Sequence, residues 1–177
     1  MMLQQLCRDD VLAVMPSAGN RVDKYLPFFN KYAEKYEVNT TLRMAHLLAQ
    51  VAHESGELRY KRELASGVKY EGRKDLGNTQ KGDGVRFKGR GFIQVTGRYN
   101  YGLVSQEFGV DFVSHPELLE QDEWAVASIF WYWKRARLNE FADKDDIETI
   151  TLRINGGNNG MKYRKEYLRK AKEVFRL

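Results

Sequence analysis

The sequence predicts a mainly α-helical protein that folds as one domain. Several segments carry apolar residues at a helical period, and turn-forming Gly, Asn and Pro residues separate them. The alternating patterns that are typical of strands are almost absent. The chain has 177 residues, of which 42% are apolar and 12% aromatic, which is enough for one domain with its own core.

The helix expected from Leu42 to Gly56 is the element around which we expect the chain to fold. Thr40 and Thr41 can cap its start, and Gly56 can take the left-handed conformation that ends a helix. At about 100° per residue, its apolar and polar side chains separate into two sectors. The apolar sector holds Met44, Ala45, Leu47, Leu48, Ala49, Val51 and Ala52, and the polar sector holds Arg43, His46, Gln50 and His53.

Glu54 lies in the last turn of this helix, at the boundary between the two sectors. A carboxyl group there faces the negative end of the helix dipole, and the apolar sector partly buries it. Both effects favour the protonated form, so Glu54 is placed to act as a general acid. The alternative is an ordinary surface glutamate at a fraying helix end.

Other helices are expected on both sides of this one. The segment from Gln121 to Leu138 carries too many aromatic residues for one narrow face, so we expect a helix that is buried nearly all round. Glycines are too dense between Gly67 and Gly91 for a stable helix, which predicts an ordered loop at a cleft, with a short hairpin around Val85 to Phe87. The remaining predicted helices run from Leu3 to Met15, Val22 to Tyr36, Asp145 to Ile154 and Met161 to Leu177.

The last of these helices has one irregular position. Arg164 projects from its apolar side, where a charged group needs either an ionic partner or a water-filled cavity. This position fits a structural ion pair and a role in a functional site equally well. The opposite face is basic, which suits either a solvated helix or contact with an anionic surface. The residues of that basic face are Lys162, Lys165, Arg169, Lys172 and Arg176.

Composition narrows the class of protein. The net charge of +5 suits an anionic partner, such as nucleic acid, a membrane surface or an acidic cell-wall polymer. No apolar run approaches the roughly 20 residues of a membrane span, and the N-terminal segment lacks the basic start of a secretory signal. Cys7 is the single cysteine, so an internal disulfide framework is excluded, and we expect a small packed residue in a chain that folds in a reducing cytoplasm.

Motifs for metal or cofactor chemistry are incomplete or missing. His53-Glu54 matches the start of a zinc-binding HExxH motif, but Glu57 stands where the second histidine should be. His46 and His53 lack a third ligand at a suitable spacing, so we interpret both as polar surface residues. There is no GxSxG motif, no Walker loop and no GxGxxG motif. We therefore predict no metal and no cofactor.

A pair of carboxyl groups can hydrolyse a glycosidic bond without a cofactor, and amide side chains with nearby aromatics suit a sugar. The second carboxylate could be Glu57, Glu63 or Glu71. Glu57 is one turn from Glu54, a short separation that would suit a retaining enzyme. Glu63 follows Lys61 and Arg62, which should keep it ionised and able to deprotonate a water molecule.

Four segments of the chain form a specific combination of motifs. They are Ala52-His53-Glu54-Ser55-Gly56, Arg62-Glu63-Leu64, Phe87-Lys88-Gly89-Arg90-Gly91-Phe92-Ile93-Gln94-Val95-Thr96-Gly97-Arg98-Tyr99-Asn100-Tyr101 and Arg153-Ile154-Asn155-Gly156-Gly157. Together they resemble glycoside hydrolase family 19, with the lysozyme-like, chitinase-related phage endolysin branch closest. The similarity runs in order from about Tyr25 to Arg176.

The resemblance implies a lysozyme-like fold with two helical lobes around a substrate cleft. Residues 1–177 would form a single catalytic domain without a separate wall-binding domain. By position, Glu54 is the general acid, Glu63 the general base and Thr96 the residue that fixes the attacking water. The remaining site residues, expected to bind substrate, are Gln94, Asn100, Asn155 and Arg164. The family inverts the anomeric centre, so the two carboxyls should lie roughly 6.5–9.5 Å apart.

The sequence also departs from the family pattern. Plant members carry disulfides and a longer insertion between the two glutamates, so the assignment of Glu63 depends on the endolysin branch, and Glu57 stays open as the second carboxylate. Chitin specificity of the plant type does not transfer.

From these residues we expect an endolysin, a peptidoglycan hydrolase that cleaves β-1,4 bonds between N-acetylated sugars and lyses the host cell. Its partners would be peptidoglycan glycan strands and, through the basic C-terminal helix, the anionic envelope surface; no nucleic acid is expected, and the protein should be a monomer. It would stay in the host cytoplasm without a signal peptide and act in the periplasm or cell wall after release by a holin. The alternatives are a chitinase and a non-enzymatic, basic protein that binds nucleic acid or the envelope.

Overall fold

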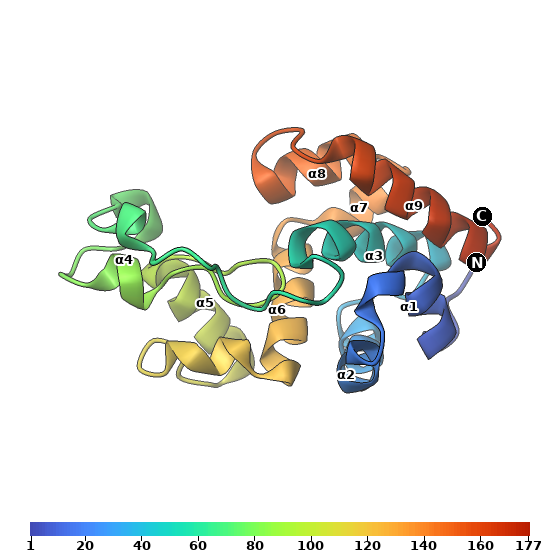
Figure 1. Cartoon of the computed structure of the whole chain (residues 1–177). Coiled ribbons are helices and arrows are strands. Elements are labelled where there is room, and N and C mark those ends of the chain that lie inside the picture. The colour runs from blue at the N-terminus through green and yellow to red at the C-terminus, as the bar shows by residue number, and fades with distance from the viewer. The chain divides into compact units, whose positions relative to one another are not determined.

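The computed structural model describes all 177 residues and consists of helices joined by loops (Figure 1), which confirms the mainly α prediction. Extended backbone pairs only in isolated bridges. No helix combines the length and the apolar composition that crossing a membrane requires. The helices are α1 Arg8–Val14, α2 Arg21–Lys35, α3 Thr41–Ser55, α4 Asp83–Arg86, α5 Arg98–Phe108, α6 Asp122–Arg135, α7 Leu138–Ala142, α8 Ile147–Asn155 and α9 Met161–Phe175, with short 3₁₀ turns at Pro16–Ala18, Val68–Tyr70, Lys74–Leu76 and Pro116–Glu120.

The chain divides into two compact units. The first unit contains Met1–Arg59 and Tyr132–Leu177, and the second contains Tyr60–Trp131. Helix α6 begins in the second unit and ends in the first. Both chain termini belong to the first unit, where they lie close together (Figure 1).

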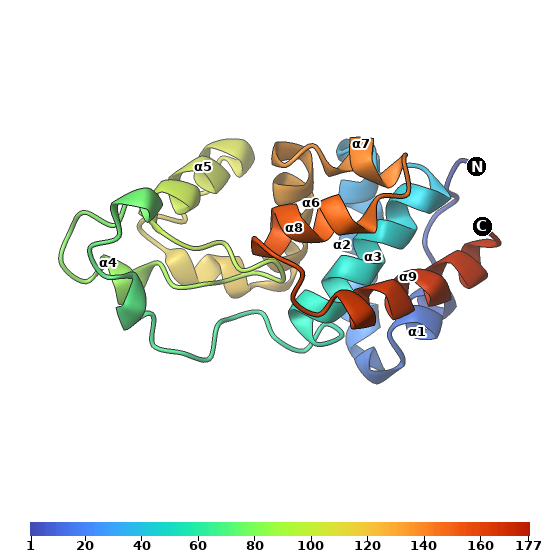
Figure 2. The same ribbon diagram turned by 90° about the horizontal axis from the view of Figure 1, so that it is seen from above.

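Helix α3 is the centre of the first unit, and α9 runs beside it (Figures 1 and 2). It begins and ends as predicted, because the Thr40 side chain accepts a hydrogen bond from the Arg43 amide and Gly56 is left-handed with φ 57°. Its apolar sector is buried, but so is part of its polar sector: His46 and Gln50 are both 0% exposed. The interpretation of His46 as a surface residue was therefore wrong.

The N-terminal helix is shorter than predicted. Residues before Arg8 are not helical, and the Leu3 amide donates to the Asn39 carbonyl at 2.8 Å instead of to a helical turn. Cys7 is the N-cap of α1, and its own amide donates to the Asp10 carboxylate. The side chain of Cys7 is exposed, so the expectation of a packed cysteine was wrong.

Helix α6 is buried along most of its length, as its aromatic content predicted. The prediction placed its end at Leu138, but Arg137 adopts a left-handed conformation with φ 55° and separates α6 from α7. The Trp133 indole is fully buried and donates to the Asn139 side chain of α7 at 2.9 Å, which fixes this corner. The buried residues of α6 are Ala125, Val126, Ala127, Ser128, Ile129, Phe130, Trp131 and Trp133.

The glycine-rich stretch of the second unit is ordered, but the hairpin expected around Val85 to Phe87 is absent. These residues belong to the short helix α4 and its C-cap. The two oxygens of Glu71 accept the amides of Gly82 and Gly84 at 2.7 and 2.8 Å, so a carboxylate satisfies the start of this helical turn. Phe87 is buried beneath it and packs against Tyr101 of α5, with 5.1 Å between ring centroids.

Candidate active site

Glu54 lies in the last turn of α3 and forms an ion pair with Arg164 of α9. The Arg164 side chain is 1% exposed and that of Glu54 is 20% exposed, so the pair lies at the edge of the buried region with the carboxylate toward solvent. The sequence predicted either a partner or a wet cavity for Arg164, and the structure shows a partner, Glu54. The sequence argument for Glu54 as an acid had not included this cation.

Arg164 has two further acceptors. One of its terminal nitrogens donates to Oε1 of Gln50, and Nε donates to the Asn159 carbonyl at 3.1 Å. Gln50 in turn donates through Nε2 to the Thr151 hydroxyl of α8 at 3.0 Å. Because the guanidinium is buried and bonded on three sides, the side chain of Arg164 is held against Glu54, and its predicted contact with substrate stays a prediction.

His53, beside Glu54, is packed between two parts of α9. Its ring stacks on Tyr163 at 6.2 Å between centroids and an angle of 17°. The backbone of Gly160 approaches the same ring so closely that a Cβ atom there would lie 2.2 Å from Cε1 and Nε2. Burial and the positive charge of Arg164 lower the pKa of His53 despite the nearby Glu54, which favours the neutral imidazole at pH 7.

Asn155 shapes the loop between α8 and α9. Its Nδ2 donates to the Asn159 carbonyl at 3.0 Å, and its Oδ1 accepts the Gly157 amide at 2.8 Å. Arg164 donates to the same Asn159 carbonyl. The first unit therefore brings together three predicted site residues, Glu54, Asn155 and Arg164.

Glu63 lies in the second unit, on a small antiparallel ladder built from three extended segments. Its amide donates to the Gly89 carbonyl at 2.9 Å, and the Gly91 amide donates to the Lys61 carbonyl at 2.9 Å. Arg90 pairs on its other side with Val95. The ladder holds Glu63 against the glycine-rich segment that carries the other predicted polar residues.

The Glu63 side chain receives three donors. Lys69 lies 2.9 Å and the Tyr70 hydroxyl 3.1 Å from Oε1, and the Gly89 amide donates to Oε2 at 3.3 Å. Burial alone would raise the pKa of this carboxyl, but the hydrogen bonds from these three groups lower it below its ordinary value. Glu63 is therefore a carboxylate at neutral pH, as predicted, although Lys69 and Tyr70 supply the stabilisation instead of Lys61 and Arg62.

Gln94, Thr96 and Asn100 form one connected group beside this ladder. The Gln94 amide packs on Gly89, where a Cβ atom would lie 2.3 Å from its oxygen. The Thr96 hydroxyl donates to the Gln94 carbonyl, and the Asn100 side chain donates to the Thr96 carbonyl, both at 2.9 Å. With Glu63, the second unit thus brings together four of the predicted site residues.

The other candidates for the second carboxylate have structural roles. Glu57 accepts the Tyr167 hydroxyl at 2.8 Å and the Ser17 amide at 2.6 Å, so it ties the end of α3 to two other parts of the first unit. Glu71 caps the turn of α4. The contacts favour Glu63, while its separation from Glu54 stays a prediction because the two residues belong to different units.

Sequence reasoning missed three groups at these sites. Gln50 stands one helical turn before Glu54, a spacing that could have marked it as a neighbour of Arg164. Lys69 and Tyr70 follow Glu63 in a loop without periodicity, so no pattern pointed to them. No group of three or more His, Cys, Asp or Glu side chains is arranged to hold a metal ion.

Solved structures share this fold. Chitinase C from Streptomyces griseus superposes with a TM-score of 0.76 at 17% identity, covering 95% of this chain and 91% of its own. The class IV chitinase of Zea mays gives a TM-score of 0.66 at 21% identity, covering 97% of this chain and 82% of its own. The arrangement of helices is therefore that of the family 19 chitinases.

Sequence comparison identifies the family. The family model described as "Chitinase class I" matches residues 38–149, a range that includes Glu54, Glu63 and Thr96 but ends before Asn155 and Arg164. A family 19 glycosyl hydrolase domain-containing protein of Haemophilus influenzae is 30% identical over 72% of this chain and 78% of its own. The chain belongs to glycoside hydrolase family 19, and it is a chitinase-like glycoside hydrolase.

The match to plant relatives is partial. An endochitinase of Arabidopsis thaliana is 32% identical over 64% of this chain, but the match spans only 39% of that relative's length. The fold and the family transfer to this chain, whereas the substrate and the biological role need their own argument.

Proposed function

We propose that this protein is a peptidoglycan hydrolase of the endolysin type that inverts the anomeric centre. The observation that carries the proposal is the pair of carboxyl groups in contrasting settings. Glu54 lies half-buried at a helix end beside Arg164, and Glu63 is held ionised beside a group of hydrogen-bonding side chains. Two carboxyl groups placed on the two sides of a glycosidic bond can serve as one acid and one base.

In the proposed reaction, Glu54 gives its proton to the glycosidic oxygen while the bond from that oxygen to C1 breaks. A water molecule attacks C1 from the opposite face, and Glu63 takes the proton that this water loses. Glu54 becomes a carboxylate in the same step, and Arg164 stabilises the charge that develops on it.

Thr96 is suited to hold the attacking water. Its hydroxyl proton is donated to the Gln94 carbonyl at 2.9 Å, which leaves the oxygen lone pairs to accept a hydrogen bond from water. Asn100 fixes the Thr96 backbone through its carbonyl. These neutral groups also suit the hydroxyl and acetamido groups of N-acetylated sugars.

Chitin is the second candidate substrate. It contains the same bond between N-acetylated sugars, and the plant relative and the two solved structures described above are chitinases. The motif resemblance to the endolysin branch and the net charge of +5, which suits an acidic wall polymer, favour peptidoglycan.

Mass spectrometry of purified peptidoglycan digested with wild type and with Glu54→Gln tests the proposal. Wild type should release fragments cleaved at the β-1,4 bond, and the variant should release none while keeping its helical circular dichroism. Soluble chitooligosaccharides form the parallel assay. If wild type cleaves the chitooligosaccharides but not peptidoglycan, the proposed substrate becomes chitin. If the Glu54→Gln variant is active, Glu54 is not the general acid.

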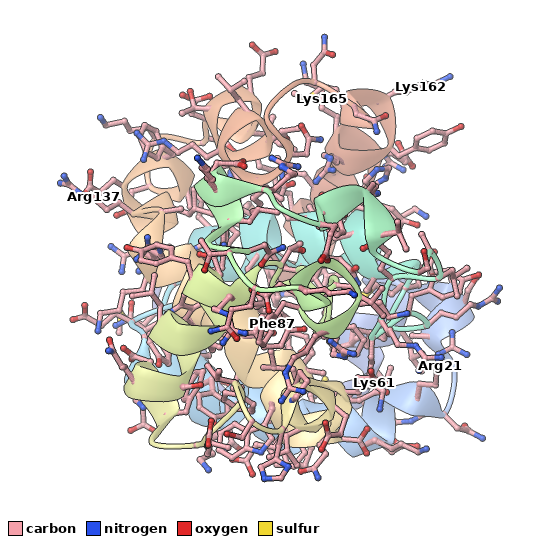
Figure 3. The ribbon with its side chains drawn as sticks, turned by 90° about the vertical axis from the view of Figure 1, so that its left-hand side faces the viewer. Arg21, Lys61, Phe87, Arg137, Lys162 and Lys165 are labelled. Carbon is pink, nitrogen blue, oxygen red and sulfur yellow. The ribbon has the colours of Figure 1, made fainter.

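The basic face of α9 gives weaker support for envelope or nucleic-acid binding. Lys162 and Lys165 extend outward from its first turns (Figure 3). Lys165 pairs with Glu148 at 2.8 Å, and Arg169 and Lys172 also have acidic partners, so much of the charge is neutralised. Binding that falls steeply with salt and occurs without bond cleavage would favour a non-enzymatic protein.

A further inference from the structure

We propose that Gln50 is a positioning residue for the general acid, holding Arg164 against Glu54 from a buried anchor on Thr151. The inference rests on the proposed function, since it assigns a role around the same carboxyl. It goes beyond that function because Gln50 and Thr151 need not touch substrate in order to act.

The first step is the register of α3. His46, Gln50 and Glu54 follow one another at intervals of four residues, so they stand on one face of the helix. That face is covered within the first unit, where Gln50 contacts α8 and α9 and Glu54 contacts α9. Gln50 therefore stands directly behind the acid on the side of Arg164.

The second step is the orientation of the Gln50 amide. Arginine has only donors, so the group that faces Arg164 must be the acceptor Oε1. The NH₂ group then points to Thr151, whose hydroxyl accepts at 3.0 Å. Because both ends of the amide are bonded and Gln50 and Thr151 are 0% exposed, the amide has one favoured orientation.

The third step is charge. Gln50 gives Arg164 a neutral acceptor, so the only carboxylate that this guanidinium contacts is Glu54. A second carboxylate at position 50 would share the guanidinium and weaken its hold on the acid. The titratable groups that face Glu54 within the first unit are His53 on α3, Arg164 on α9 and Tyr132 on α6.

Removing the amide should therefore loosen Arg164 without touching the reacting atoms. Gln50→Met keeps the length of the side chain but leaves one buried nitrogen of Arg164 without an acceptor. The carboxylate form of Glu54, which the proposed reaction produces, would lose stabilisation. Proton transfer should then be slower, and the fall of kcat at basic pH should begin at a higher pH.

His46→Met is the matched control. His46 is equally buried on the same face of α3, but its Nε2 lies 2.8 Å from Asp145, which also binds Lys172. Neither partner contacts Arg164 or Glu54. The control therefore reports what the loss of a buried polar side chain from this face does to the enzyme in general.

The experiment measures kcat, KM and their pH profiles for wild type, Gln50→Met, Thr151→Val and His46→Met on the substrate that wild type cleaves. We expect Gln50→Met to lower kcat on the order of tenfold, with KM within about twofold, and to move the basic limb of the kcat profile to higher pH. Thr151→Val should shift the limb in the same direction by less. His46→Met should leave the limb in place.

A basic limb that stays in place in both Gln50→Met and Thr151→Val overturns the inference. If Gln50→Met does not fold, the Thr151→Val profile decides alone. The Glu54→Gln variant distinguishes a wrong positioning role from a wrong proposed function. If Glu54→Gln is inactive and the basic limb is unshifted in Gln50→Met and Thr151→Val, only the role of Gln50 is rejected. An active Glu54→Gln removes the acid and the positioning role together.

Discussion

The backbone of Gly160 lies so close to the ring of His53 that a Cβ atom at position 160 would be 2.2 Å from two ring atoms. Gly160 also has φ +72°, a conformation that L side chains rarely adopt. This contact places the start of α9, and with it Arg164, against the end of α3. Close approach and backbone conformation both require glycine here.

Gly160→Ala should therefore destabilise the protein more than an ordinary left-handed glycine substitution does. The matched control is Gly156→Ala, where φ is +76° but no atom lies within 4 Å of the new Cβ. Backbone strain should cost about 1 kcal/mol in each variant, and displacement of His53 should add about 1–2 kcal/mol in Gly160→Ala alone. Urea unfolding measures both, and equal losses would contradict the contact.

Glutamine substitutions should separate the two remaining candidates for the base. Glu63→Gln should abolish glycan cleavage, because an amide cannot take the proton of the attacking water. Glu57→Gln should keep most activity and lose roughly 1 kcal/mol of stability, since Glu57 binds Tyr167 and Ser17. Product release and thermal unfolding of both variants provide the measurement. An active Glu63→Gln with an inactive Glu57→Gln would exchange the two roles.

Lys69→Met should narrow the pH range of activity on its acid side. Burial raises the pKa of Glu63, and the bonds from Lys69, Gly89 and Tyr70 lower it below its ordinary value, so the base stays ionised in mild acid. Without Lys69 the pKa should rise, and Glu63 would become protonated at a higher pH. The acid limb of the kcat/KM profile should move upward.

Lys88→Met is the control for this shift, because the Lys88 amine donates to the Ala65 carbonyl at 3.2 Å and not to Glu63. Its acid limb should match that of wild type. An unchanged limb in Lys69→Met would show that Glu63 is not the group that titrates there.

His46 should make the free energy of unfolding fall as the pH drops below about 6.5. Burial lowers its pKa more than the bond to Asp145 raises it, whereas the unfolded chain binds a proton near pH 6.5. The unfolded state then holds more protons as the pH falls, so the contribution is complete above pH 7 and declines below about 6.5. For one proton the slope is at most about 1.4 kcal/mol per pH unit.

Urea unfolding at pH 5, 6 and 7 tests this dependence. His46→Met should unfold with a smaller difference between pH 7 and pH 5 than wild type shows. His115→Gln, which changes an exposed histidine of the second unit, should leave the difference unchanged. The same slope in His46→Met as in wild type would contradict the effect.

Sequence patterns predicted the structure correctly where neighbouring residues in the sequence determine it. The cap at Thr40 and the left-handed Gly56 set the ends of α3. The charge of Arg164 on an apolar helix side indicated either a partner or a wet cavity, and the structure shows a partner, Glu54. The partner itself depends on which helices pack together, and periodicity within one helix carries no such information.

The predictions that were wrong concern residues whose structure depends on contacts with distant parts of the chain. His46 looked like a surface residue because Asp145, its partner, is 99 positions away in the sequence. The hairpin prediction failed because Glu71 stabilises a helical turn at α4, and α5 was not predicted at all. The donors around Glu63 come from a loop whose path follows from tertiary contacts alone.

The ladder beneath Glu63 limits where the length of this chain can change. Side chains alternate between the two faces of extended backbone, and Glu63 is paired to Gly89 while Lys61 is paired to Gly91. One residue inserted between Lys61 and Glu63 would turn the carboxylate to the opposite face. The exposed segment from residue 72 to 75 takes part in no such bridge, so an inserted residue there should leave the face of the Glu63 carboxylate unchanged.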